Sequence, residues 1–221
     1  MDSVILLMAG KGQRMKKNIN KALLDIEGLP LFMYPLNTFL SFGFEIILVV
    51  SEEDFKLVSD MNLKNVKIVK GGKTRAESVY NGLKKANGEY ILIHDAARAF
   101  VDKKTIKNIL DIKNNEEAIL TYLDVKDTIK IKENNIYKTL KRDDLIAAST
   151  PQCASRKIFL EVYQKSIDEK FISSDDISLI EKYRPDIKIN YILANEESFK
   201  ITTPLDYELA KIIGRKFKWL E

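Results

Sequence analysis

Cysteine, histidine and long apolar runs are scarce in this chain, which has one cysteine and one histidine among 221 residues. The single cysteine, Cys153, excludes an intramolecular disulfide and a cysteine-rich zinc site. With His94 as the only histidine, a histidine-based metal site or a Ser-His-Asp triad is disfavoured. The longest apolar runs, Val4–Ala9 and Ile46–Val50, are far shorter than the ~20 residues of a membrane-spanning helix, and the N-terminus shows no secretory signal. These absences predict a cytoplasmic protein with no membrane partner.

A strong charge imbalance is also lacking, because 36 basic and 32 acidic residues leave a net charge of +4 with the signs interspersed. A nucleic-acid-binding surface needs a concentrated basic stripe, so we expect no nucleic-acid partner. The composition of 45% hydrophobic and 31% charged residues is typical of a folded globular chain. A length of 221 residues suits one domain, 1–221, with a substantial core.

The first half of the chain alternates short apolar runs with helical patterns. This alternation predicts an α/β fold with a doubly wound, mostly parallel sheet and right-handed crossovers. The expected strands are 4–8, 45–50, 66–69, 90–93 and 118–123, and the expected helices are 31–42, 52–61, 74–86 and 103–113.

The pattern changes after the fifth expected strand, where polar and apolar residues alternate on both sides of Glu133-Asn134-Asn135. This alternation predicts a β-hairpin, which we interpret as an inserted arm over approximately residues 124–142. Helical periodicity returns at 156–166 and 175–183, and a strand is expected at 187–193. Thr203-Pro204 is typical of a helix start and predicts a C-terminal helix to about Trp219.

Ligands of open α/β sheets bind at the carboxyl ends of the strands, so the residues after each strand are candidate site residues. Gly10 and Gly12 follow the first strand, with Arg14 and Lys21 close behind. Glycines let backbone N–H groups approach a phosphate, and the two cations can neutralise it. A tight turn bearing surface cations is an equally good interpretation, and neither the dinucleotide fingerprint nor the P-loop pattern is present.

Two later loops have the same character. Gly71-Gly72-Lys73 leads into a helix with a capping box from Thr74 to Glu77, and helix N-termini favour anions. Asp95 follows the fourth strand, where a carboxylate suits Mg²⁺ together with phosphate oxygens. His94 is better explained as a packed histidine than as a catalytic base.

Seven blocks of sequence, in fixed order along nearly the whole chain, resemble a bacterial cytidylyltransferase family. The blocks are Met8–Met15 with Asn20-Lys21, Gly71–Val79 with Gly82-Leu83, His94–Arg98, Lys126–Lys130, Thr150–Gln152, Ser174–Asp176 and Phe199–Thr202. Members of this family make cytidine-diphosphate-methylerythritol in the non-mevalonate isoprenoid pathway. The resemblance implies a Rossmann-like nucleotidyltransferase fold and CMP transfer from CTP to 2-C-methyl-D-erythritol 4-phosphate, with release of pyrophosphate and with Mg²⁺ as cofactor.

The resemblance also implies roles for individual residues. The implied catalytic residues are Arg14, Lys21 and Asp95, and Asp95 is also the implied metal ligand. The implied nucleotide-binding residues are Ala9, Gly10, Lys11, Gly12, Gly72, Lys73, Ser78 and Lys200. The implied acceptor-binding residues are Asp95, Arg98, Thr128, Arg142 and Lys200. In the family the arm that bears Thr128 and Arg142 completes the acceptor pocket of a neighbouring subunit, which implies a homodimer.

The chain departs from the family pattern at Met8, Asn20, Ala22 and Ala99. Asn20 stands where the family has a proline before the catalytic lysine, and Met8 stands where it has an alanine. These departures keep open a cytidylyltransferase for another polyol phosphate, such as ribitol 5-phosphate. Weaker alternatives are a nucleotidyltransferase for sugar 1-phosphates and a non-catalytic regulator that binds a nucleotide or a sugar phosphate.

Overall fold

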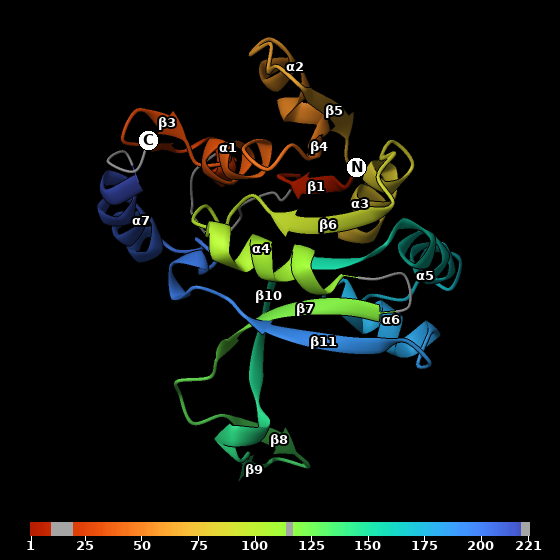
Figure 1. The fold of residues 1–221 in the computed structure, drawn as a ribbon. Coiled ribbons are helices and arrows are strands. Elements are labelled where there is room, and N and C mark those ends of the chain that lie inside the picture. The colour runs from red at the N-terminus through yellow and green to blue at the C-terminus, as the bar shows by residue number, and fades with distance from the viewer. Residues whose placement is uncertain (10–19, 114–116, 218–221) are drawn as a thin grey trace.

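A seven-stranded sheet with helices on both faces forms the centre of the molecule in the computed structural model, which describes residues 1–9, 20–113 and 117–217 (Figure 1). The sheet strands are β1 (Ser3–Leu7), β4 (Glu45–Val50), β5 (Val66–Lys70), β6 (Tyr90–Asp95), β7 (Glu117–Asp124), β10 (Ile146–Ser155) and β11 (Lys188–Leu193). Their order across the sheet is β11-β7-β10-β6-β1-β4-β5. The pairs β1–β4, β1–β6, β4–β5 and β7–β11 are parallel, which confirms the mostly parallel sheet expected from the sequence.

The helices cover both faces of this sheet and bury two main apolar clusters. They are α1 (Met33–Leu40), α2 (Glu52–Ser59), α3 (Arg75–Leu83), α4 (Lys103–Ile112), α5 (Arg156–Asp168) and α6 (Ile177–Tyr183), and a further helix, α7 (Pro204–Phe217), follows toward the C-terminus. One cluster joins α1, α2 and α4 to the sheet, and the other joins α3, α5 and α6 to its opposite face. All six residues of β4 are buried, as a strand covered on both faces requires.

The sheet strand β10 was missing from the sequence prediction. It lies between β6 and β7 and is antiparallel to both. Its sequence, IAASTPQCAS, contains small polar residues and Pro151, so it lacks the apolar run or alternation by which strands are recognised. The register shifts between Ala148 and Gln152, and β10 is exposed over its first three residues and buried from Ser149 onward.

Two local details of the N-terminal half also differ from prediction. The residues ahead of the helix expected at 31–42 form a short hairpin, in which Pro30 ends β3 (Leu29–Pro30) and β3 pairs with β2 (Asp25–Ile26) around a Glu27-Gly28 turn. Both turn residues have positive φ, 53° and 84°, as a tight hairpin turn requires. Helix α1 begins only at Met33, so Pro35 lies in its first turn, where proline is tolerated.

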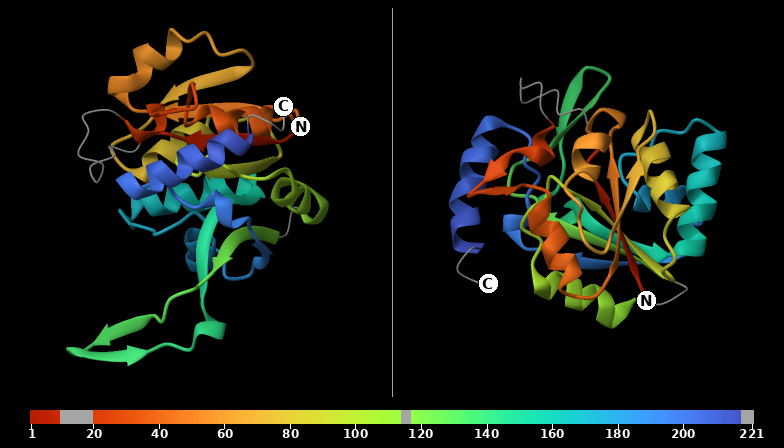
Figure 2. Two further views of the ribbon diagram at one scale, coloured as in Figure 1. Left: turned by 90° about the vertical axis from the view of Figure 1, so that its left-hand side faces the viewer. Right: turned by 90° about the horizontal axis from the view of Figure 1, so that it is seen from above.

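The predicted arm is a two-stranded hairpin of β8 (Lys130–Glu133) and β9 (Ile136–Thr139) that extends away from the main sheet (Figures 1 and 2). Asn134 and Asn135 form its turn with positive φ. All eight strand residues are exposed, including Ile131, Ile136 and Tyr137. The hairpin therefore contributes little to the core of this chain.

The C-terminal helix α7 packs beside the β2–β3 hairpin rather than on the main sheet. Ala210 and Ile213 form a third buried cluster with Ile26, Leu31 and Phe100. Trp219, the predicted end of this helix, lies outside the described residues. No helix in the described part of the chain is long and apolar enough to span a membrane.

Candidate active site

The chain reverses its winding direction at β1. From β1 it continues outward through β4 and β5, and then returns to β6 on the other side of β1. Such a reversal leaves a crevice outside the carboxyl ends of the strands, where ligands bind in open α/β sheets.

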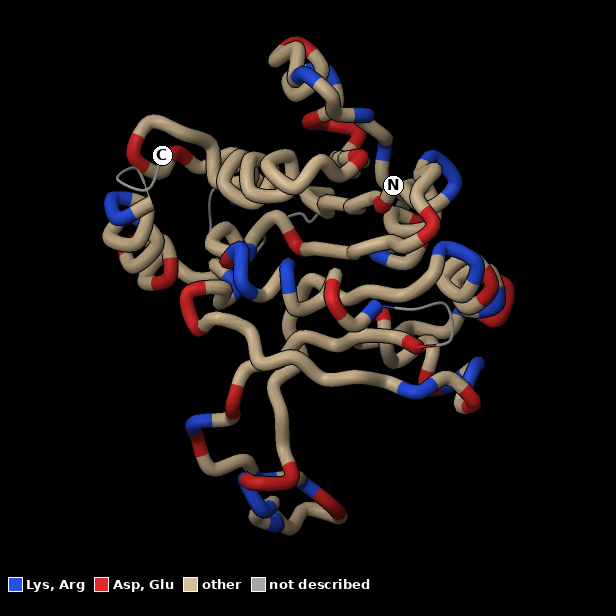
Figure 3. Tube along the Cα trace, in the orientation of Figure 1, with Lys and Arg blue, Asp and Glu red and all other residues tan. Residues whose placement is uncertain are grey.

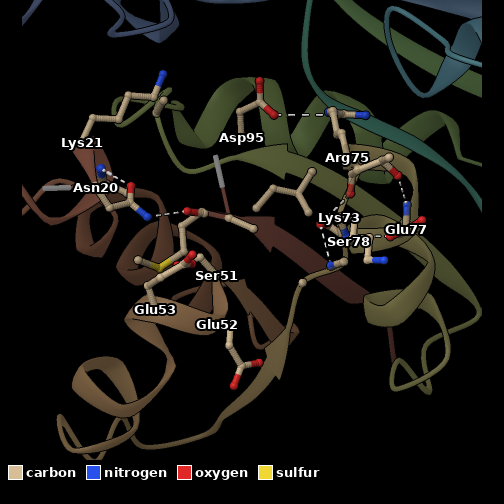
Figure 4. Close-up of a pocket in the computed structure, with 18 of the residues that line it drawn as sticks. Asn20, Lys21, Ser51, Glu52, Glu53, Lys73, Arg75, Glu77, Ser78 and Asp95 are labelled. Carbon is tan, nitrogen blue, oxygen red and sulfur yellow. Dashed lines mark hydrogen bonds and ion pairs between the residues drawn. The ribbon is translucent and has the colours of Figure 1, made fainter. Parts of the chain in front are cut away.

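A cavity of about 830 Å³ lies at this position (Figure 4). Its walls come from the carboxyl ends of β1, β4, β5 and β6, from the segment at Lys21 and from Lys200. The described residues that line it are Leu7, Met8, Ala9, Asn20, Lys21, Ala22, Ser51, Glu52, Glu53, Gly71, Gly72, Lys73, Thr74, Arg75, Glu77, Ser78, Asp95, Ala97 and Lys200. The volume is within the range of small-molecule sites.

Most of the described residues predicted for the site line this cavity. They are Ala9, Lys21, Gly72, Lys73, Ser78, Asp95 and Lys200. Gly10, Lys11, Gly12 and Arg14 lie outside the described residues, so their predicted contacts stay predictions. Arg98 is not among the lining residues but donates to the carbonyl oxygens of Ser198 (3.1 Å) and Ala148 (3.4 Å) next to the site.

Thr128 and Arg142 are exposed at the two ends of the arm, outside the cavity. A single chain therefore does not bring them to the other predicted residues. Their predicted role is in the acceptor pocket of a second subunit. The structure of a single chain does not test that role.

The glycine turn after β5 is built for close backbone approach. A Cβ atom at Gly72 would lie 2.3 Å from Glu77 Cβ, and one at Gly71 would lie 2.9 Å from Ala9 Cβ. The Gly72 N–H donates to Ser78 Oγ at 3.0 Å, and Ser78 Oγ donates to the Thr74 carbonyl at 2.8 Å. Only glycine fits at these two positions, so the cavity wall here is bare backbone.

The predicted capping box of α3 is present in altered form. Thr74 Oγ1 accepts from the Glu77 N–H at 3.1 Å, as predicted. The Glu77 carboxylate, however, accepts from the Lys73 N–H at 2.6 Å rather than from Thr74. The bond from the Lys73 N–H to Glu77 therefore fixes the backbone of Lys73 against the start of α3.

Asp95 is the last residue of β6 and the acidic centre of the site. Lys200 Nζ lies 2.7 Å from Asp95 Oδ2, and Arg75 Nη2 lies 3.7 Å from Oδ1. Burial alone would raise the pKa of Asp95, but the charges of Arg75, Lys200 and Arg98 outweigh it and hold the pKa well below its ordinary value. Asp95 is therefore ionised at neutral pH.

Arg75 links Asp95 to a second, fully buried carboxylate. Its guanidinium donates to both oxygens of Asp176, at 2.5 and 2.8 Å. Asp176 also accepts from the Tyr163 hydroxyl, and its backbone N–H donates to Gln152 Oε1 at 3.0 Å. Burial alone would lower the pKa of Arg75, but Asp176 raises it well above its ordinary value. Arg75 lies within the Gly71–Val79 block, but the sequence predicts no site role for it.

The wall formed by Ser51, Glu52 and Glu53 was also missed from the sequence. These residues follow β4, so the rule that directed attention to the other strand ends applies to them equally. Ser51 caps α2 by accepting from the Asp54 N–H at 3.1 Å. Figure 4 shows Glu52 and Glu53 on the side of the cavity away from Asp95.

His94 and Cys153 have no catalytic environment, in agreement with the sequence analysis. His94 is fully buried, with Nε2 2.9 Å from the Arg98 carbonyl and Nδ1 3.0 Å from Thr150 Oγ1. Burial lowers the pKa of His94 to about 4, so it is neutral at pH 7. Burial raises the pKa of the Cys153 thiol to about 12, so Cys153 behaves as a packed apolar residue.

Lysine and arginine are interspersed with acidic residues along the described chain and form no single basic stripe (Figure 3). The cations at the cavity come from distant parts of the sequence. Lys21 Nζ donates to the Ile201 carbonyl at 3.1 Å, next to Lys200. Lys21 and Lys200 thus bring positive charge from distant parts of the sequence to one cavity.

Comparison with known proteins agrees with this architecture. The family model described as 2-C-methyl-D-erythritol 4-phosphate cytidylyltransferase (IspD) matches residues 3–216. A protein of that name from Clostridioides difficile is 33% identical over 96% of this chain and 93% of its own length. One from Clostridium botulinum (strain 657 / Type Ba4) is 38% identical over 97% of this chain and 98% of its own length.

Among solved structures, the crystal structure of 4-diphosphocytidyl-2C-methyl-D-erythritol synthase from Anaerococcus prevotii has a TM-score of 0.83 at 27% identity. It covers 97% of this chain and 98% of its own. The family match over nearly the full length, the relatives above 30% identity and the shared fold agree with one another. The chain therefore belongs to the 2-C-methyl-D-erythritol 4-phosphate cytidylyltransferase family of nucleotidyltransferases.

Proposed function

We propose that this chain transfers CMP from CTP to 2-C-methyl-D-erythritol 4-phosphate, giving 4-diphosphocytidyl-2-C-methyl-D-erythritol and pyrophosphate. A phosphate oxygen of the acceptor attacks the α-phosphorus of CTP, and the bond from that phosphorus to the pyrophosphate oxygen breaks. The observation that supports this best is the meeting of Lys21, Lys73, Lys200 and Asp95 at one cavity, in a chain of this family.

The chemistry needs charge neutralisation more than covalent help, since negative charge grows on the α-phosphate and the leaving pyrophosphate. In our proposal Lys21 stabilises that charge, together with Arg14 from the opening loop. Lys21 is well placed for this role because its Nζ lies at the Ile201 carbonyl, beside Lys200 and across the cavity from the glycine turn. A cation aimed at developing charge is commonly worth about 3 kcal/mol of transition-state stabilisation.

The glycine turn is the proposed site for the cytosine and ribose. Gly72 and Lys73 present backbone to the cavity, and Ser78 holds the turn in shape through its two hydrogen bonds. Bare backbone allows a planar base to approach closely. Ala9 and the loop of Gly10, Lys11 and Gly12 would then enclose the triphosphate.

Mg²⁺ fits this donor set only in company with substrate phosphates. The described residues contain no cluster of three or more His, Cys, Asp or Glu side chains that could hold a metal by themselves. Asp95 supplies one ionised carboxylate at the cavity, and Mg²⁺ in nucleotide sites is commonly bound by one or two carboxylates plus phosphate oxygens. When bound, Mg²⁺ would neutralise phosphate charge, and Asp95 would orient it.

We further propose that the acceptor is bound between subunits of a homodimer. Arg98 lies beside the cavity, whereas Thr128 and Arg142 lie on the arm. The arm is exposed along both strands and bears Ile131, Ile136 and Tyr137, apolar side chains that a partner subunit would cover. A cytoplasmic location stays a prediction.

A pyrophosphate-release assay tests the reaction. CTP and a divalent cation would be offered with methylerythritol, ribitol, glycerol and choline phosphates in turn. Release with methylerythritol phosphate well above the others is expected. Faster release with ribitol 5-phosphate would show that ribitol 5-phosphate is the acceptor. CTP binding without turnover on any acceptor would favour a non-catalytic regulator.

The role of Lys21 is tested by Lys21→Ala, with Lys85→Ala as a control that removes the same charge from an exposed site outside the cavity. Turnover should fall on the order of 100-fold in Lys21→Ala while CTP affinity changes little, because the charge acts mainly in the transition state. Lys85→Ala should match the unchanged protein. Equal losses of turnover and CTP affinity in Lys21→Ala would contradict the proposed role.

A further inference from the structure

The side-chain amide of Asn20 makes hydrogen bonds through both its nitrogen and its oxygen. Its Nδ2 donates to the Met8 carbonyl at 2.7 Å and to Asp54 Oδ2 at 2.7 Å. Its Oδ1 accepts from the Ala22 N–H at 3.0 Å. One side chain adjacent to Lys21 is therefore tied to three separate points.

These three points belong to different elements. Met8 follows β1, Asp54 lies in the first turn of α2, and Ala22 is the middle residue of the short 3₁₀ helix η2 (Lys21–Leu23). Figure 4 shows Asn20 next to Lys21 at the edge of the cavity. The amide thus joins the segment that presents Lys21 to the end of β1 and to the first turn of α2.

The acceptor on α2 is itself held in place. Ser51 Oγ donates to Asp54 Oδ2 at 2.7 Å, while the Asp54 N–H donates back to Ser51 Oγ at 3.1 Å. The carboxylate can therefore move little relative to the helix start. On the other side of Lys21, the Phe32 N–H fixes the Ala22 carbonyl at 3.0 Å.

An N-cap would by itself be an ordinary structural feature, since asparagine is a preferred capping residue. The bond from Ala22 to Oδ1 is that cap. The two donor bonds are different, because Met8 and Asp54 are not part of η2 and do nothing for its capping. Their effect is to fix where the backbone of Lys21 leaves the cavity wall.

We propose that Asn20 is a positioning residue for Lys21, acting through its donor bonds to Met8 and Asp54. The proposal rests on the proposed function, in which Lys21 stabilises the transition state. Misplacement of a catalytic group by about 1 Å can cost ~100-fold in rate. Loss of the two bonds should therefore reduce turnover without removing any group that contacts substrate.

Asn20→Ser separates positioning from capping. Serine is an equally good N-cap, but it is too short to reach Met8 and Asp54 while capping. We expect kcat to fall about tenfold or more, KM for CTP to change less than about threefold and the melting temperature to stay close to that of the unchanged protein. Asn20→Ala, which also loses the cap, should lower both kcat and the melting temperature.

Asp54→Ala tests the same link from the other side. The cap of α2 survives in this variant because it uses the backbone N–H of residue 54. Its kcat should fall, but by no more than in Asn20→Ser, because the bond from Asn20 to Met8 remains. The double variant should be no slower than Asn20→Ser, which already lacks both donor bonds. Ser155→Ala, which loses the cap of α5 at the end of the sheet opposite the cavity, is the matched control and should keep kcat.

Lys21→Ala, measured in the same series, distinguishes a failure of the positioning role of Asn20 from a failure of the proposed function. If Lys21→Ala is slow and Asn20→Ser keeps full kcat, the positioning role is overturned and the proposed function stands. If Lys21→Ala turns over like the unchanged protein, the role of Lys21 in the proposed function is overturned and the positioning role with it. Additive losses in the double variant would also overturn the shared link.

Discussion

Glu45, at the end of the sheet opposite the cavity, allows a quantitative test of how the sheet is held together. The side chain is 8% exposed at the start of β4, and its carboxylate accepts four hydrogen bonds. The donors are Ser3 Oγ (2.5 Å), Lys67 Nζ (2.5 Å), and the Asn87 backbone N–H (2.7 Å) and Nδ2 (2.8 Å). One ionised group thus connects β1, β4, β5 and the turn before β6.

Burial alone would raise the pKa of Glu45, but the hydrogen bonds from Lys67, Ser3 and Asn87 outweigh it and lower the pKa from 4.5 to about 2. A shift of this size corresponds to about 3 kcal/mol. Because the folded-state pKa is depressed, this stabilisation is fully present above pH 4.5 and is lost as the pH falls through 2. By pH 3 about 2 kcal/mol should be gone, less the part of the Lys67 attraction that solvent screens.

Urea unfolding of the unchanged protein and of Glu45→Gln between pH 7 and pH 3 measures this contribution. At pH 7 the variant should be less stable by about 3 kcal/mol, because its amide directs a donor at other donors and leaves bonds unmade. The difference should shrink by about 2 kcal/mol toward pH 3, as the carboxylate of the unchanged protein takes up its proton. If the difference in free energy of unfolding stays constant from pH 7 to pH 3, the Glu45 carboxylate does not stabilise the fold through a lowered pKa. CTP kinetics at pH 7 should be unaffected, since Glu45 lies at the end of the sheet opposite the cavity.

Three further predictions concern the site and the arm. Arg75→Lys should lower kcat/KM about ten- to hundredfold in the pyrophosphate assay, because lysine cannot hold both oxygens of Asp176 in a fork, and full activity would contradict this. Tyr163→Phe should cost about 2 kcal/mol in urea unfolding, since it removes a hydrogen bond to the buried Asp176 carboxylate, and an unchanged midpoint would argue against that bond. Arg142→Ala should raise KM for the acceptor and leave KM for CTP nearly intact. Mixing Arg142→Ala with Lys21→Ala chains should restore some activity if arms cross between subunits, and no recovery would count against a crossed arm.

The parallel part of the sheet could be predicted because its strands are continuous apolar runs. A strand buried on both faces, such as β4, needs apolar residues at every position, and the helices between such strands show their own period. Once the strands were predicted, their carboxyl ends were known. The rule that ligands bind there then placed Ala9, Gly72 and Asp95 at one site, and all three line the cavity.

Strand β10 could not be predicted from the same signals. Its buried residues from Ser149 to Ser155 include Thr150, Pro151 and Gln152, whose burial depends on partners far away in sequence. Thr150 Oγ1 accepts from the Asp95 N–H at 3.1 Å, and Gln152 Oε1 accepts from the N–H groups that open α6. Tertiary hydrogen bonds, not local preference, place this strand in the sheet.

The contacts of Arg75 and Asn20 were missed for the same reason. Arg75 appeared in the motif, but its partner Asp176 is 101 residues away, and only the fold shows that the two meet. Asn20 was noted only as a departure from the family pattern at a position before Lys21. Its bonds to Met8 and Asp54 depend on the fold bringing the end of β1 and the first turn of α2 within reach of one side chain.

Pairing with carboxylates explains how cations such as Arg75 and Lys200 can line one cavity in a stable fold. Arg75 is neutralised by the buried Asp176, and Lys200 by Asp95, so neither cation is left unpaired against the sheet. Lys21 donates to the carbonyl oxygen of Ile201, beside Lys200. Asp95 is 14% exposed and Lys200 is 44% exposed, so the lysine is the partner that an incoming phosphate can reach. The carboxylates thus hold the cations in position before substrate binds, and the reorganisation needed to meet the charge of a triphosphate is correspondingly small.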